Sequence, residues 1–134
     1  MPSEPGVPRP FALIVAEDLF VSTRLRIGLE HMGYEAADVQ ATDVPTIVAA
    51  RLPDIALVSF GRETFDAPAL VESLKLLSPA PAVIGFVPHV QMPFVRPNAI
   101  RAGVDLLVAN SAIAARLPQI VQKLLKRDVT GEQP

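Results

Sequence analysis

The sequence predicts a doubly wound α/β domain with a parallel five-stranded sheet in the strand order 2-1-3-4-5 and helices on both faces. Three observations support this fold class. Five runs of strand length recur along the 134 residues, segments of helical period separate them, and the runs are nearly all apolar. Strands that are apolar on both faces are typical of a parallel sheet covered on both sides. Five such units in this length favour the 2-1-3-4-5 order.

The five predicted strands are bounded by turn signals or by helical segments. The third is opened by a Pro-Asp pair and is followed by Phe60 and Gly61. Short apolar runs bounded in this way are typical of buried strands. The strands are expected at residues 11–16, 34–39, 54–59, 82–87 and 104–109.

The first predicted helix has the clearest pattern. Apolar residues from Val21 to Met32 repeat every three or four positions, Asp18 precedes them as a candidate N-cap, and Gly33 follows as a stop signal. Three shorter helices are expected at residues 45–52, 68–77 and 98–103, where prolines or small residues stand at the ends.

The last predicted helix has an apolar stripe on one side. A proline in a helix interior costs about 3 kcal/mol, so this helix must begin near Pro118. The stripe consists of Leu117, Ile120, Val121, Leu124 and Leu125.

Composition excludes several function classes. The 14 acidic and 12 basic residues form no block of like charge, which argues against a nucleic-acid partner. The absence of cysteine excludes disulfides, thiol catalysis and cysteine-bound metals, and fits a cytoplasmic protein. No glycine-rich run opens a helix, so a phosphate-binding loop is not expected.

The ends of the chain differ in composition from its centre. Residues 1–10 contain four prolines and no apolar core segment, so we expect an extended arm rather than a secretory signal or a membrane span. Residues 128–134 are polar and are expected to fray, which leaves residues 11–127 as the folded domain. No attached output domain is expected.

In a doubly wound fold, a site is expected where the carboxyl ends of the strands meet. A serine nucleophile there would need a nearby base, and neither His31, late on the first helix, nor His89, in a loop, is suitably placed. We therefore do not expect an enzyme. The residues at strands one, three, four and five are Ala16, Glu17, Asp18, Ser59, Phe60, Gly61, Val87, Pro88, Asn110 and Ser111.

Three stretches in order resemble the receiver domain of two-component response regulators, the chemotaxis-protein-like family with a flavodoxin-like fold. ALIVAEDLFVSTRLRIGLEHMGY is similar to its first strand, acidic turn and first helix. RLPDIALVSF is similar to its third strand, and RAGVDLLVANSA to the entry into its last strand. The resemblance covers residues 12–127.

The resemblance implies a degenerate phosphorylation pocket. A working receiver uses an aspartate as phosphoryl acceptor, two acidic residues for magnesium, a Thr or Ser, and a Lys. A serine cannot form the acyl phosphate that an aspartate forms, and one carboxylate leaves only a weak relic of a metal site. In register, these positions are Ser59, Ala16 with Glu17, Val87 and Asn110, and the aromatic switch position is Leu107.

The predicted function is that of a pseudo-receiver: a phosphorylation-independent signalling or regulatory module without a cofactor. It would act on a protein partner or a second copy through the face formed by the fourth helix, fifth strand and fifth helix, and not on membranes. The alternatives are a small-ligand or metal-binding domain and, on the same fold, an enzyme of unrelated chemistry. The ligand crevice would be lined by Glu17, Ser59, Phe60, Val87 and Asn110.

The segment 88–97 contains more apolar side chains than a solvated connector needs. They could pack over the sheet edge or form the contact surface for a partner. The candidate surface residues are Val90, Met92, Phe94 and Val95.

Overall fold

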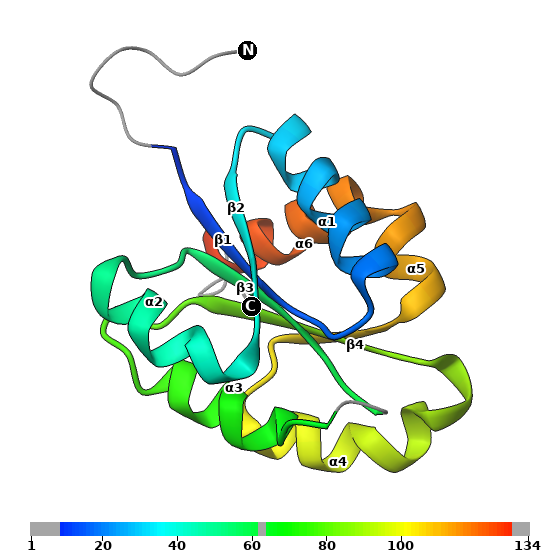
Figure 1. The fold of residues 1–134 in the computed structure, drawn as a ribbon. Coiled ribbons are helices and arrows are strands. Elements are labelled where there is room, and N and C mark those ends of the chain that lie inside the picture. Colours follow the sequence, from blue (N-terminus) through cyan, green and yellow to red (C-terminus); the bar gives the residue numbers. More distant parts are fainter. Residues whose placement is uncertain (1–8, 62–63, 130–134) are drawn as a thin grey trace.

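The computed structural model of the chain describes residues 9–61 and 64–129. Its centre is a five-stranded parallel sheet in the order β2-β1-β3-β4-β5 (Figure 1). This confirms the predicted fold class and strand order. The strands are β1 (Phe11–Val15), β2 (Glu35–Val39), β3 (Ile55–Ser59), β4 (Ala82–Val87) and β5 (Leu106–Ala109), each close to its predicted range.

Helices cover both faces of the sheet. In Figure 1, α1, α5 and α6 lie on one face, and α2, α3 and α4 lie on the other. Their bounds are α1 (Leu19–His31), α2 (Val44–Ala50), α3 (Ala67–Lys75), α4 (Met92–Ala102), α5 (Asn110–Ala115) and α6 (Leu117–Val129), with two 3-10 turns, η1 (Ala41–Asp43) and η2 (His89–Gln91).

Each central strand contributes side chains to two separate apolar clusters. On β1, Ala12 and Ile14 pack with α1 and α6, whereas Leu13 and Val15 pack with α2, α3 and α4. This alternation is the period of two that a strand imposes. The complete burial of β1 and β3 explains why both strands appear in the sequence as continuous apolar runs.

Local signals explain where α1 begins and ends. Asp18 has an extended backbone, and its side chain accepts from the amides of Phe20 and Val21, which have no partner within the helix. Gly33, with φ of 96°, follows the end of the helix in a conformation that other residues rarely adopt. Both predictions for this helix are confirmed.

The segment 88–97 is not a connector, because α4 already begins at Met92, after η2, and not at residue 98. Pro93 stands in the first turn, where a missing N–H costs no hydrogen bond. Pro97 lies inside the helix and removes one bond. Burial of Ala99 and Ala102 against the sheet stabilises the helix despite this loss.

The chain after β5 contains a helix that the apolar pattern did not indicate. Asn110 begins the short α5, which ends at Ala115, and α6 starts at Leu117. Pro118 is therefore the second residue of α6, the position that a proline in this segment requires. Because α6 continues to Val129, residues 128 and 129 of the expected tail are helical, and residues 130–134 lie outside the described residues.

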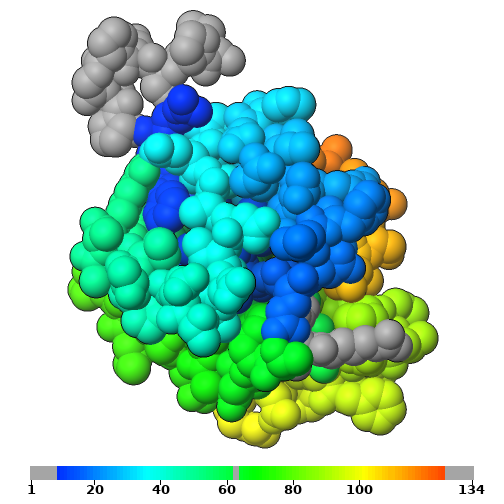
Figure 2. Space-filling view, viewed as in Figure 1, coloured from blue at the N-terminus to red at the C-terminus, as the bar shows by residue number. Residues whose placement is uncertain are grey.

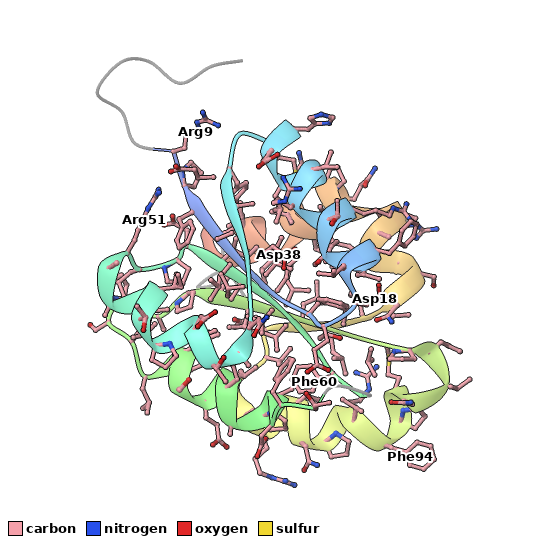
Figure 3. The ribbon with its side chains drawn as sticks, viewed as in Figure 1. Arg9, Asp18, Asp38, Arg51, Phe60 and Phe94 are labelled. Atoms are coloured by element: carbon pink, nitrogen blue, oxygen red, sulfur yellow. The ribbon has the colours of Figure 1, made fainter. Side chains whose placement is uncertain are left out.

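The entry into β1 is tied to neighbouring elements. Arg51 donates to the carbonyl of Arg9 and forms an ion pair with Glu35, and its guanidinium lies 4.8 Å from the centroid of the Phe11 ring. Figure 3 shows Arg9 and Arg51 at the same end of the sheet. Residues 9 and 10 of the expected arm are thus held against the domain, and residues 1–8 lie outside the described part.

Candidate functional site

A cavity of about 470 Å³ lies at the carboxyl ends of β1, β3, β4 and β5. Four of the predicted pocket residues line it, namely Ala16, Glu17, Ser59 and Asn110. Parallel strands place their carboxyl ends at one edge of the sheet, which is why residues so far apart in the sequence meet there. The cavity is completed by Asp18, Val21, Phe60, Phe86 and Pro88.

Val87 is not among the residues that line this cavity. Its side chain is fully buried and packs with the cluster beneath α2, α3 and α4, on the opposite face of β4 from Phe86. Alternation along the strand gives the crevice Phe86 and Pro88 instead. The structure therefore places the predicted hydroxyl position within the core.

Ser59 ends β3 and is 5% exposed. Neither histidine lines the cavity, because His31 ends α1 and His89 begins η2, both with exposed side chains. Ser59 thus has no imidazole base beside it among the described residues of this crevice.

The carboxylate of Glu17 contacts the segment that precedes α3. It accepts a hydrogen bond from the backbone amide of Thr64 at 2.9 Å and a second one from the Thr64 hydroxyl. These bonds join residues 47 positions apart and connect the β1–α1 turn to the β3–α3 segment. Thr64 could not be predicted from the sequence, because no spacing pattern indicates that a threonine in that loop meets the end of β1.

A divalent metal of the kind that receivers bind does not fit these residues. Magnesium prefers several oxygen ligands, at least one or two of them carboxylates, in octahedral geometry. The side-chain donors that line the cavity are the carboxylates of Glu17, which accepts from Thr64, and Asp18, whose Oδ1 caps α1, together with a serine and an asparagine. In the ranges 9–61 and 64–129, no three His, Cys, Asp or Glu side chains come together as a metal site.

The side chain of Asn110 contains a buried oxygen, Oδ1, without a hydrogen-bond partner among the described residues. A buried carbonyl oxygen without a partner costs about 1–3 kcal/mol, so a donor from water or a ligand would stabilise it. The amide lies at the start of α5, the place that the resemblance assigns to the lysine.

Leu107, at the predicted switch position, is half-buried and packs in the cluster on the α2–α4 side. The ring of Phe60 lies in the same cluster and is 2% exposed. Both side chains crowd around Gly85 on β4, which leaves no room there for a β-carbon. A continuous apolar packing of Phe60, Gly85 and Leu107 thus lies behind the crevice.

The candidate partner surface divides into two pairs of residues. Val90 and Phe94 are 72% and 80% exposed, and Figure 3 shows Phe94 at the outer edge of α4. Met92 and Val95 are half-buried and pack against the core. Only Val90 and Phe94 are therefore fully available for a contact, because a helix buries one side against the sheet.

Comparisons with known proteins rest on structure alone. No protein-family model and no curated protein matches the sequence. A response regulator from Thermotoga maritima superposes with a TM-score of 0.75 at 17% identity, covering 87% of this chain and 98% of that chain. The signal receiver domain of an HD domain-containing protein from Pseudomonas fluorescens Pf-5 gives 0.75 at 19%, covering 89% and 96%.

A CheY-like receiver domain of a response regulator from Methylobacillus flagellatus gives a TM-score of 0.72 at 20% identity, with 86% of this chain and 98% of that chain covered. None of the helices in the described ranges has the length and hydropathy of a membrane-spanning segment. Identities of this size establish the fold and not the activity. The chain has the α/β fold of response-regulator receiver domains.

Proposed function

We propose that this domain is a receiver-like signalling module that works without phosphorylation, through contacts with a protein partner or a second copy in the cytoplasm. The observation that carries the proposal is the chemistry of the crevice. By the resemblance, Ser59 at the end of β3 corresponds to the aspartate of a working receiver, and Asn110 at the start of α5 corresponds to its lysine.

The electrostatics of the crevice support this proposal. Phosphoryl transfer depends on cations that neutralise the developing charge on the phosphoryl oxygens. Glu17 bonds Thr64, Asp18 caps α1, and neither lysine nor arginine lines the crevice among the described residues. A phosphoryl group would meet carboxylates and neutral side chains there.

The packing behind the crevice supports a domain with one conformation. A receiver that switches needs two arrangements that differ by only a few kcal/mol. Here Phe60 and Leu107 pack closely around Gly85, and Val87 is fully buried. A second conformation would require the side chains of Phe60 and Leu107 to separate from Gly85.

An NMR titration with beryllofluoride and magnesium tests phosphorylation independence, with an active receiver domain as the positive control. We expect no change in the amide signals around Ser59 or Leu107. The amide signals of the variant Ser59→Asp are also expected not to change, because Ala16 and Asn110 still lack the charges that phosphoryl transfer requires. Saturable shifts around Ser59 in the unaltered protein would contradict the proposal.

Docking through α4 is tested with one pair of variants. Phe94→Glu puts a charge on the proposed face, whereas Leu76→Glu puts one on an equally exposed leucine, 86% exposed, just after α3. If the partner is a second copy, we expect Phe94→Glu to abolish self-association in analytical ultracentrifugation; if it is another protein, we expect Phe94→Glu to abolish its capture. Leu76→Glu is expected to leave either interaction unchanged. Equal behaviour of the two variants would exclude this face.

A second candidate function is the binding of a small ligand in the crevice, and the unpartnered Oδ1 of Asn110 favours it. A ligand with a hydrogen-bond donor would satisfy that oxygen. Thermal-shift measurements against metals and nucleotides test this function, with Ser59→Phe as the variant that fills the crevice. A shift that Ser59→Phe leaves unchanged would place the ligand elsewhere.

A further inference from the structure

A second, larger cavity of about 690 Å³ lies between the carboxyl ends of β1 and β2. It is separate in position from the docking face on α4, and of the crevice residues only Ala16 and Glu17 also line it. A volume of this size is in the range that holds a small organic ligand. The residues that matter for its chemistry are Glu17, Leu19, Asp38, Val39, Ala41 and Phe65.

The walls of this cavity combine apolar surface with carboxylates. Leu19 begins α1 and is 71% exposed, although it is a large apolar side chain. Val39, Ala41 and Phe65 are half-buried around the same space. Solvent-exposed apolar side chains that line a cavity are more typical of a binding surface than of a packed core.

Asp38 is the principal charged group. It is the penultimate residue of β2 and is half-buried, and its Oδ2 accepts a hydrogen bond of 2.7 Å from the hydroxyl of Ser22 on α1, which is fully buried. This bond fixes the carboxylate in place, because the serine cannot move without disturbing α1. Figure 3 shows Asp38 on β2, across from the start of α1 at Asp18.

The carboxylate of Asp38 is under-satisfied for its position. An ionised carboxylate can accept about four hydrogen bonds, and in the described part of the chain Asp38 accepts one. The residue is half-buried, so water compensates only part of the missing bonds. A cationic donor in the cavity would supply the charge and the hydrogen bonds together.

The sign of the charge around the cavity is uniform among the described residues. Two carboxylates, Glu17 and Asp38, line it, and no lysine, arginine or histidine does. Space-filling atoms of the same segments, the start of α1, the end of β2 and the residues before α3, meet on the face shown in Figure 2. An anionic ligand would be repelled here, and a neutral one would leave Asp38 uncompensated.

We propose that this cavity binds a small organic cation, an ammonium or guanidinium group carried on a short apolar body. The cationic group bonds Asp38, and the apolar body packs against Leu19, Val39 and Phe65. This inference does not depend on the proposed signalling function, because its central residue, Asp38, lines neither the crevice around Ser59 nor the face of α4.

Three probes of nearly equal size test the proposal by NMR titration of the full chain: 2-phenylethylammonium, 2-phenylethanol and 3-phenylpropionate. The ammonium is expected to shift the amide signals of Asp38, Val39 and Ala41 with a saturable curve. The alcohol is expected to bind at least about tenfold more weakly, the difference of one charge-assisted hydrogen bond. The third probe, 3-phenylpropionate, is expected not to bind.

Two matched variants test whether the carboxylate of Asp38 is the group that binds the ammonium. Asp38→Asn keeps the shape and still accepts from Ser22, and is expected to lower the affinity for the ammonium to that for the alcohol. Asp43→Asn removes a charge from the adjacent η1, outside the cavity lining, and is expected to leave the affinity within about twofold of the unaltered protein.

Several results would overturn the proposal. Equal affinities for the ammonium and the alcohol, equal affinities before and after Asp38→Asn, or shifts confined to Ser59 and Asn110 would each refute it. So would the absence of any saturable shift at millimolar concentrations of the ammonium. Failure of these titrations would leave the beryllofluoride and Phe94→Glu experiments unaffected, so the two proposals are tested separately.

Discussion

The ring of Phe60 packs against the backbone of Gly85 on the neighbouring strand. A β-carbon added to Gly85 would come within 2.9 Å of Phe60 Cε1, closer than β-carbons approach other atoms in folded proteins, and within 3.0 Å of Leu107 Cδ1. Glycine is required there by the close approach of two core side chains, because Gly85 lies within β4 and does not have a positive φ.

Gly85→Ala is therefore expected to lower the free energy of unfolding by about 1–3 kcal/mol, the usual cost of overpacking a core. Urea denaturation measures the loss. Gly28→Ala on α1 is the matched control. Its new methyl group would meet only the end of the Leu117 side chain, at 2.8 Å, and alanine favours a helix over glycine by about 1 kcal/mol.

The double variant Phe60→Leu with Gly85→Ala provides the second check. Removing the ring relieves the contact, so the two losses are expected not to add, as for residues in direct contact. Strict additivity, or equal losses for Gly85→Ala and Gly28→Ala, would show that Phe60 does not restrict this position.

Asp18 and Asp43 make a second matched pair, because each precedes a helix but only Asp18 caps one. Asp18 accepts from Phe20 N at 2.9 Å and from Val21 N at 3.3 Å, whereas the side chain of Asp43 makes no capping bond to α2. Asp18→Ala is expected to cost about 1 kcal/mol in thermal or chemical denaturation, and Asp43→Ala much less. Similar losses for both would argue against the cap.

The half-buried ion pair between Lys75 and Asp105 is expected to matter more than the surface pair on α1. Asp105 accepts from Lys75 Nζ at 2.9 Å and from the amide of Val83 at 2.8 Å, with side chains 28% and 32% exposed. Asp105→Ala is expected to destabilise the protein by about 1–2 kcal/mol, largely because the Val83 amide loses its partner.

Glu30→Ala is the comparison for this prediction. The Arg26–Glu30 pair spans 3.5 Å on the solvent side of α1, and such pairs contribute about 0.5 kcal/mol or less. Urea denaturation of both variants at low and high salt separates the two cases. A loss for Glu30→Ala as large as that for Asp105→Ala would contradict the argument from burial.

Stability at alkaline pH is expected to depend on Tyr34. Burial, and then the neighbouring charge of Asp54, raises the pKa of the Tyr34 hydroxyl above its ordinary value of 10.0. A group whose pKa is higher in the folded state contributes stability that is complete below the unfolded pKa and is lost as the pH rises through the folded one. The unaltered protein should therefore lose stability above about pH 10.

Tyr34→Phe removes this titration. Denaturant midpoints measured between about pH 8 and pH 11 should fall less steeply in the variant than in the unaltered protein. Glu35→Gln, at the neighbouring position, serves as the control. Arg51 lowers the pKa of Glu35, so this carboxyl affects stability only as the pH falls into the acidic range. Identical alkaline slopes with and without Tyr34 would refute the prediction.

The arrangement of strands could be predicted because the chain itself carries the pattern. Runs such as 11–16 and 54–59 are apolar at every position or nearly so, and β1 and β3 are fully buried in the structure. Asp18 and Gly33 define α1 through local hydrogen bonding and backbone freedom, which depend only on neighbouring residues. The start of α4 was missed because Pro93 and Pro97 are typical of loops.

The features of the site likewise divide into those that the sequence predicts and those that only the folded chain creates. The chain order alone brings Ala16, Ser59 and Asn110 to one edge, because Ser59 ends a parallel strand and the other two directly follow one. The loss of a phosphoryl acceptor, as the resemblance implies it, also depends only on which side chain stands at each position. Side-chain contacts such as Glu17 with Thr64, and Ser22 with Asp38, join residues 47 and 16 positions apart, and no local pattern indicates them.

Residue order thus determined the layers and the strand order, since these depend on the periodicity of the side chains. Tertiary packing alone decided that Val87 faces the core, that Phe60 covers Gly85, and that an acidic, apolar cavity opens beside Asp38. Those outcomes depend on which face of a strand meets which helix and on the space left between side chains, and both are settled only when the whole chain has folded.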